Sequence, residues 1–178
     1  MKQLSQNILD IAMNSVRAGA TETLINIFEN TADHSMTISI IDNGCGMSEE
    51  MVKSVTDPFC TTRTTRPVGL GVPLFKMEAE MTGGSFDISS ELGVGTTVRA
   101  TFDTSSIDLI PLGNIAETML SLVSASPDAD FALTHRKDGR QLCFDTKEVR
   151  AQLEGVPIDT PEVLLWIRDY LCELYEQF

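Results

Sequence analysis

The chain has 178 residues, 42% hydrophobic and 22% charged, which is typical of a globular protein with one core or a core and a small appendage. It contains no apolar run of 18 residues and its first residues carry no secretory signal, so we expect a cytoplasmic protein with no membrane span. The net charge of −13 repels the phosphate backbone of nucleic acids and excludes them as expected partners.

The cysteines are interpreted as free thiols in a reducing compartment. They form no CxxC pair, and neither of the two histidines completes a metal-ligand spacing with them. The cysteines are Cys45, Cys60, Cys143 and Cys172.

The first expected element is a helix over residues 3–20. Apolar residues recur along it with helical periodicity, and Gly19 is a natural end point. A polar stripe lies on the opposite face, because its members are spaced four and three residues apart. This stripe is either solvated or functional, and it consists of Gln3, Asn7, Asp10, Asn14 and Arg17.

After this helix we expect a hairpin of strands, a short helix capped by Ser48, a polar loop, another helix and a second hairpin. Alternating apolar residues indicate the strands, and a glycine- and threonine-rich composition without periodicity indicates the loop. These elements cover residues 23–42, 48–57, 58–72, 73–81 and 85–102.

The sequence pattern changes after residue 103, where we place a domain boundary between residues 1–103 and an α/β appendage, residues 104–178, of unknown role. The appendage is expected to contain a linker, a helix, a hairpin around Asp138 and Gly139, and a last helix opened by Thr160 and a proline. The apolar side of the last helix packs against the first domain, or it serves partner docking or dimerisation.

Three glycine motifs lie between the elements of the first domain. They are Asp-Asn-Gly-Cys-Gly at 42–46, Gly-Leu-Gly at 69–71 and Gly-Val-Gly-Thr-Thr at 93–97. Each alone is consistent with an ordinary turn or loop. Their order along the chain is more informative than any single motif.

In sequence the chain presents the motifs at residues 10–14, 42–46, 57–59, 69–71 and 93–97. This series resembles the N, G1, F, G2 and G3 boxes of the gyrase/Hsp90/histidine-kinase/MutL ATPases, over about residues 3–102. Residues 14–21 are similar to the MutL-type N box, whereas residues 58–71 look like the nitrogen-regulator type of histidine kinase. The resemblance implies an α+β fold of the Bergerat type: a two-layer sandwich of a mixed, mostly antiparallel sheet with helices on one face.

The resemblance implies ATP and Mg²⁺ as cofactors. Asp42, at a strand end beside glycines, suits a hydrogen bond from the adenine amino group. Asn14 offers a neutral oxygen to Mg²⁺, and the backbone N–H groups of residues 69–72 at a helix start suit a phosphate. The implied nucleotide contacts are Asn14, Arg17, Asp42, Gly44, Gly46, Met47, Phe59, Thr62, Arg63, Arg66, Gly69, Leu70, Gly71, Val72 and Thr97.

The arginines of this set leave two interpretations open. Arg63 and Arg66 lie in a threonine-rich loop and are either γ-phosphate ligands or solvated charges of a lid. Arg17 lies one turn beyond Asn14, where histidine kinases usually have a lysine, so the positive charge is kept.

Asp10 is the candidate catalytic residue, one helical turn before Asn14. Several relatives, the anti-sigma-factor kinases among them, have a glutamate general base there, whereas histidine kinases usually have an asparagine. An aspartate fits between the two patterns and is one methylene shorter than glutamate. It is either a base, or it positions a Mg²⁺-bound water or the helix.

Only nine residues precede Asp10, and neither histidine lies on a dimerising helical hairpin, so we do not expect a complete sensor kinase. One hypothesis is an enzyme: a stand-alone protein kinase that phosphorylates a partner, or a slow ATPase. The other is a binding module, an ATP-gated switch whose lid, residues 48–68, becomes ordered on nucleotide. A protein partner is expected, and a homodimer stays open.

Overall fold

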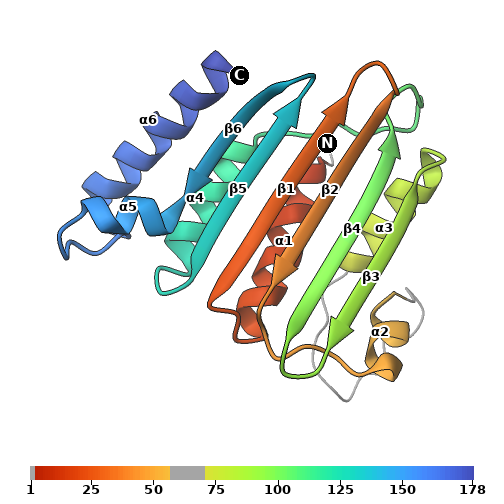
Figure 1. Cartoon of the computed structure of the whole chain (residues 1–178), viewed down its shortest axis with the longest axis horizontal. Helices are drawn as coiled ribbons and strands as arrows, with labels where there is room; N and C mark the ends of the chain where they lie inside the picture. Colours follow the sequence, from red (N-terminus) through yellow and green to blue (C-terminus); the bar gives the residue numbers. More distant parts are fainter. Residues whose placement is uncertain (1–2, 57–70) are drawn as a thin grey trace.

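The computed structural model describes residues 3–56 and 71–178, which form one six-stranded sheet in the order β3-β4-β2-β1-β5-β6 with helices packed against it (Figure 1). The strands are β1 (Glu22–Asn30), β2 (Ser35–Asp42), β3 (Ser85–Glu91), β4 (Gly95–Asp103), β5 (Asp130–Lys137) and β6 (Arg140–Asp145). The helices are α1 (Leu4–Arg17), α2 (Glu49–Thr56), α3 (Gly71–Met81), α4 (Ile115–Ala125), α5 (Thr146–Gln152) and α6 (Pro161–Gln177).

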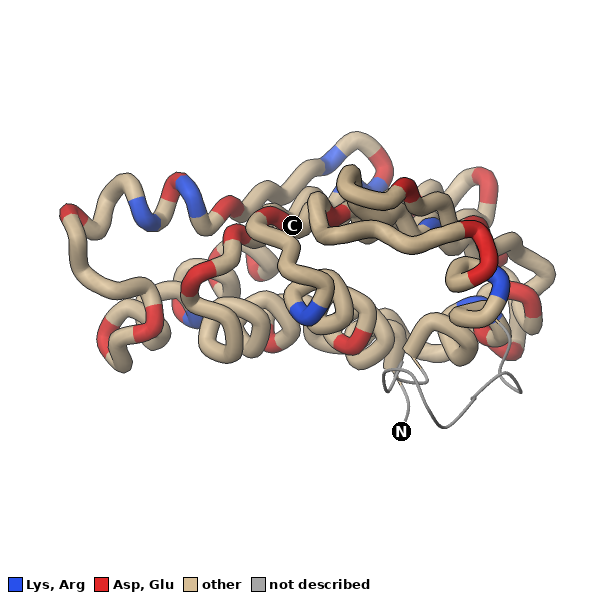
Figure 2. The backbone as a smooth tube through the Cα atoms, turned by 90° about the horizontal axis from the view of Figure 1, so that it is seen from below, with Lys and Arg blue, Asp and Glu red and all other residues tan. Residues whose placement is uncertain are grey.

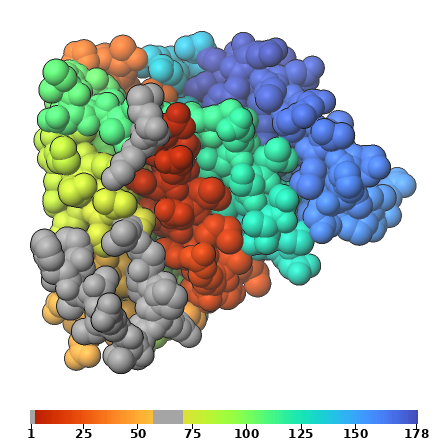
Figure 3. All heavy atoms as spheres, turned by 180° about the vertical axis from the view of Figure 1, so that it is seen from behind, coloured from red at the N-terminus to blue at the C-terminus, as the bar shows by residue number. Residues whose placement is uncertain are grey.

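The sheet is mixed and mostly antiparallel. β1 and β5 pair in parallel, and the other four neighbouring pairs are antiparallel. Figure 3 shows α1 in red, α3 in yellow and α4 in green side by side on one face of the sheet. The predicted α+β sandwich with helices on one face is therefore confirmed.

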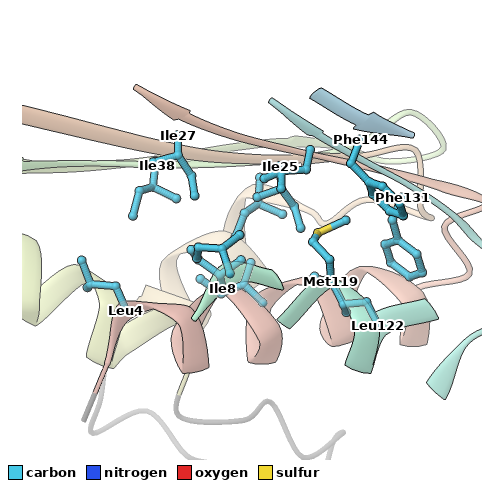
Figure 4. Packing of buried hydrophobic residues seen from close by; sticks show 14 of the residues in the cluster. Leu4, Ile8, Ile25, Ile27, Ile38, Met119, Leu122, Phe131 and Phe144 are labelled. Carbon is cyan, nitrogen blue, oxygen red and sulfur yellow. The ribbon is translucent and has the colours of Figure 1, made fainter. Parts of the chain in front are cut away.

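The core lies between this helical layer and the sheet. Strand side chains alternate between the two faces, so Ile25, Ile27 and Ile38 all point toward the helices and are fully buried. Leu4 and Ile8 of α1 meet them from below (Figure 4). The apolar stripe that predicted the first helix is thus its core-facing side.

The C-terminal residues extend the same sheet and the same core. β5 pairs with β1 over eight positions, from Glu22–Asp130 to Glu29–Lys137. Met119 and Leu122 of α4 and Phe131 of β5 belong to the same buried cluster as the α1 residues (Figure 4). The domain boundary at residue 103 stays a prediction; the sheet and the core both continue across it.

Residues of the predicted linker lie against the start of α1. The first backbone N–H groups of a helix have no partner within the helix. Here the Leu4 N–H donates to the Pro111 carbonyl at 3.0 Å and the Ser5 N–H to the Leu112 carbonyl at 2.7 Å. Gly113 packs so closely on Ser5 that a Cβ there would lie 2.3 Å from the Ser5 hydroxyl oxygen. The linker therefore helps to fix the helix that carries the polar stripe.

The end of α6 is joined to the sheet through His135, which is 2% exposed. Its Nε2 lies 2.8 Å from Glu29 Oε1 and its Nδ1 lies 3.1 Å from the Tyr175 hydroxyl. Lys137 Nζ donates to the other Glu29 oxygen at 3.0 Å, and the Phe178 ring lies 4.6 Å from the imidazole. The Glu29 carboxylate of β1 thus binds two residues of β5, and one of them, His135, contacts Tyr175 of α6.

This cluster predicts a pH dependence of folding stability. The hydrogen bond from His135 is the main cause that holds the pKa of Glu29 below its ordinary 4.5; burial opposes it and Lys137 adds to it. A lowered carboxyl pKa stabilises the fold above the unfolded pKa, and this contribution is lost as the pH falls through the folded pKa. We expect Glu29→Gln to lower the free energy of unfolding at pH 7, and the difference from wild type to shrink on acidification below about pH 4.5. Urea unfolding at several pH values measures it, with the exposed Glu176→Gln as control.

Acidic residues are spread along the described chain and are not gathered in one segment (Figure 2). Any anionic ligand must therefore be held by local donors that act against the overall charge. Among residues 3–56 and 71–178, no helix is long and apolar enough to cross a membrane.

Candidate functional site

A cavity of about 340 Å³ opens between α1, α2 and the ends of β2, β3 and β4, within the range of roughly 300–1,000 Å³ for small-molecule sites. Six predicted residues line it: Asn14, Arg17, Asp42, Gly46, Met47 and Val72. The other lining residues, which were not among the predicted nucleotide contacts, are Ile11, Ser15, Ala18, Cys45, Met51, Val55, Ile88, Thr96 and Val98. The lining is mostly apolar with a few polar groups, as is usual for small-molecule sites.

Asp42 places a carboxylate in this cavity, and both of its oxygens already accept hydrogen bonds. Ser15 Oγ donates to Oδ2 at 2.6 Å, and the Gly44 backbone N–H donates to Oδ1 at 2.9 Å. Because each carboxylate oxygen has about two lone-pair sites, acceptor capacity remains on both oxygens. Asp42 can therefore accept a hydrogen bond from a ligand without losing its own anchors.

The glycines after Asp42 let the loop pack closely. Gly46 has a φ of +67°, and a Cβ there would lie 1.9 Å from the Glu91 carbonyl oxygen. Gly44 is buried, and a Cβ there would meet both Asp42 and Ala18 at 3.0–3.1 Å. No side chain fits at Gly46 without a backbone shift, which accounts for the second glycine of the motif.

The β3–β4 hairpin holds this loop from the other side. The Gly93 N–H donates to the Cys45 carbonyl at 2.8 Å. The Met47 N–H donates to Ser90 Oγ at 2.8 Å, and this hydroxyl also contacts the Gly95 carbonyl and the Thr96 hydroxyl. The glycines at 93 and 95 thus serve the hairpin that supports the cavity floor.

Thr96 lines the cavity, whereas the predicted contact Thr97 does not. Val98, Ala100 and Phe102 are buried toward the helices, and strand alternation places Thr96 on their side and Thr97 on the opposite face. The contact predicted for Thr97 stays a prediction, and its neighbour Thr96 is the residue that lines the cavity. The strand period, counted back from the buried residues of β4, would have selected Thr96.

Asn14 and Arg17 meet at the mouth of the cavity, where Arg17 NH1 donates to Asn14 Oδ1 at 3.0 Å. The amide oxygen has a second lone pair, so this contact leaves it able to bind a cation. Arg17 is exposed, and its guanidinium adds positive charge at the edge of the cavity. A neutral amide oxygen beside a guanidinium is a pair of groups that fits a Mg²⁺-phosphate group.

Asp10 and Gly71 lie against each other beside the cavity rather than in its lining. A Cβ on Gly71 would lie 2.9 Å from the Asp10 Cβ, so the first residue of α3 has to be small. Asp10 itself is exposed. The carboxylate therefore lies next to the N-terminus of an 11-residue helix, where the helix dipole favours negative charge.

Six predicted contacts lie outside the described residues. They are Phe59, Thr62, Arg63, Arg66, Gly69 and Leu70. They stay predictions, as does the function of the lid, residues 48–68, which contains the first four of them.

The model of the family "Histidine kinase-, DNA gyrase B-, and HSP90-like ATPase" matches residues 1–106, more than half of the chain. Sporulation kinase D of Bacillus subtilis is 33% identical over 103 residues, which cover 58% of this chain and 20% of that protein. Sensor protein SrrB of Staphylococcus aureus is 36% identical over 102 residues, covering 54% of this chain and 17% of that protein. This chain thus spans a fifth or less of the length of these relatives.

A solved structure of the N-terminal domain of a DNA repair protein shares the fold, with a TM-score of 0.52 and 11% identity. The likeness covers 80% of this chain and 52% of that one, so it reaches beyond the 106 residues of the family match. The likeness concerns the fold, whereas the family match over α1 to β4 leads to one conclusion: the chain belongs to the histidine kinase-, DNA gyrase B- and HSP90-like ATPase family.

Proposed function

We propose that the chain binds Mg²⁺-ATP in the cavity beside α1 and transfers the γ-phosphate to a protein partner. The observation that carries the proposal is the doubly anchored carboxylate of Asp42 inside an apolar cavity. An oriented acceptor surrounded by apolar walls suits the amino edge of adenine, which needs one directional contact and two apolar faces.

The phosphate end of the proposed site is supported by α1 and α3. Asn14 Oδ1 would hold Mg²⁺ through its free lone pair. Arg17 would face the phosphates, and the N–H groups at the start of α3, next to Gly71, would bind them without side-chain charge. These donors act locally against the net charge of the chain.

The proposed transfer step uses Asp10 as general base. Bound Mg²⁺-ATP supplies an electrophilic γ-phosphorus. Asp10 would accept the proton of the partner's hydroxyl or imidazole as that group attacks, and ADP would leave with the electrons of the broken P–O bond. The relatives named as a kinase and a sensor support this reaction class. The alternative is an ATP-gated switch that does no chemistry.

The first test of the proposal is direct ATP binding to the full chain, measured by calorimetry with Mg²⁺ present. We expect saturable one-site binding that weakens when Mg²⁺ is chelated. Absence of heat up to millimolar ATP would refute the proposed function.

Asp10→Asn separates the kinase from the switch. We expect ATP affinity to stay within about twofold of wild type, because Asp10 lies outside the cavity lining. Phosphoryl transfer should fall by about 10²- to 10⁴-fold, the usual effect of removing a general base. Transfer from γ-labelled ATP to proteins of a cell extract, and phosphate release, measure the step. The exposed Asp33→Asn is the control. Unchanged transfer in Asp10→Asn would mean that Asp10 is not the general base and instead positions a Mg²⁺-bound water or the helix.

A further inference from the structure

Ser90 has three hydrogen-bond partners and one proton, so the direction of each bond is determined. Its Oγ lies 2.9 Å from the Gly95 carbonyl, which can only accept. The Met47 N–H, which can only donate, lies 2.8 Å away. The Ser90 proton therefore goes to Gly95, and the hydroxyl must accept from its third partner, Thr96, at 2.8 Å.

The hydrogen bond to Ser90 determines whether the Thr96 hydroxyl can donate to, or accept from, a ligand in the cavity. A threonine hydroxyl has one proton and two lone pairs, and its proton is committed to Ser90. Thr96 therefore presents lone pairs to the cavity it lines. The hydroxyl is an acceptor for a ligand, although an unconstrained threonine could also donate.

Asp42, Thr96 and Ser90 form a row across three strands. Asp42 of β2 pairs with Thr96 of β4, and Thr96 pairs with Ser90 of β3. Directly opposite residues have Cβ atoms about 4.5–5.5 Å apart on one face of the sheet. The Asp42 carboxylate and the Thr96 hydroxyl are thus neighbouring acceptors, and no donor side chain stands between them in the register.

We infer that Ser90 is a positioning residue that sets nucleobase selectivity by fixing the proton of Thr96. The inference rests on the proposed function and adds which group the purine base carries at its 6-position. Two adjacent acceptors match an exocyclic amino group, which offers two N–H donors. A keto oxygen at the same place offers none and faces lone pairs on both sides, so the site selects a 6-amino over a 6-keto purine.

Ser90→Ala removes the acceptor of the hydrogen bond that the Thr96 hydroxyl donates. The Thr96 hydroxyl can then rotate and donate to a keto oxygen, while Asp42 still disfavours it. We expect wild type to prefer ATP over ITP, and we expect Ser90→Ala to lower this preference by about 3- to 10-fold, the effect of one neutral hydrogen bond. Calorimetric dissociation constants for both nucleotides, with Mg²⁺, give the ratio.

Three variants separate selectivity from stability. Ser90→Thr keeps the hydroxyl and should keep the wild-type ratio. Ser89→Ala removes the neighbouring hydroxyl, which is exposed and lies on the other face, and should also keep it. Thr96→Val removes the second acceptor itself and should lower the preference even if Ser90→Ala folds poorly.

The outcomes distinguish the two proposals. If Ser90→Ala weakens ATP and ITP binding by the same factor, or if Thr96→Val leaves the ratio unchanged while wild type prefers ATP, the inference is wrong and the proposed function stands. If wild type binds neither nucleotide, the proposed function fails, and the inference fails with it.

Discussion

Asp42→Asn is expected to weaken ATP binding by about 10- to 150-fold, the equivalent of losing a charged hydrogen bond of about 1.5–3 kcal/mol. The replacement amide can keep its oxygen at the Gly44 N–H. Its NH₂ group then faces the Ser15 hydroxyl, which at present donates to the carboxylate. A donor also replaces the acceptor that the base amino group needs.

The measurement is the ATP dissociation constant by calorimetry, with circular dichroism to confirm that the fold is retained. Asp87→Asn, exposed on β3, removes the same charge elsewhere and should leave affinity unchanged. If Asp42→Asn binds ATP within threefold of wild type, the cavity is not the nucleotide site.

Phe131→Ala is expected to lower the free energy of unfolding by about 3–5 kcal/mol, the usual cost of deleting a buried phenylalanine ring. Phe131 is fully buried and belongs to the same core cluster as Leu4 and Ile8 of α1. Because β5 pairs with β1 over its whole length, the loss should destabilise the N-terminal strands as well.

Urea unfolding should therefore show one transition for Phe131→Ala by circular dichroism and by the emission of Trp166, the single tryptophan. Phe28→Ala, on the open face of β1 and 37% exposed, is the matched control and should cost much less. Two separate transitions, with ATP binding surviving the first, would instead make residues 104–178 an independent unit.

Much of the fold could be predicted from local patterns. The helical periodicity of residues 3–20, the alternating strands and the Asp138–Gly139 turn all correspond to observed elements: the turn residues have φ values of +48° and +86°. These signals depend on neighbours in sequence. The short helix α5 was missed, because its seven residues offer too little periodicity.

The pairing of β1 with β5 could not be predicted, because it joins segments separated by about a hundred residues and leaves no local trace. The same limit applies to the site. The motifs identified Asn14, Asp42, Gly46 and Met47, but not Ser15 or Ser90, whose roles depend on hydrogen bonds to residues 27 and 43 positions away. A match to family motifs identifies the residues within each motif. It does not identify residues elsewhere in the chain that orient them through hydrogen bonds.

The parallel pairing of β1 and β5 has a practical consequence for any shortened form of the chain. A fragment confined to the family-matched residues would leave the outer backbone edge of β1 without its strand partner across eight positions. Open strand edges act as templates for other chains, and the core-facing side of this one carries Ile25 and Ile27. In a fragment limited to the family-matched residues, the central strand β1 would thus become an open edge strand that can pair with other chains. We therefore expect this fragment to be less soluble than the full chain.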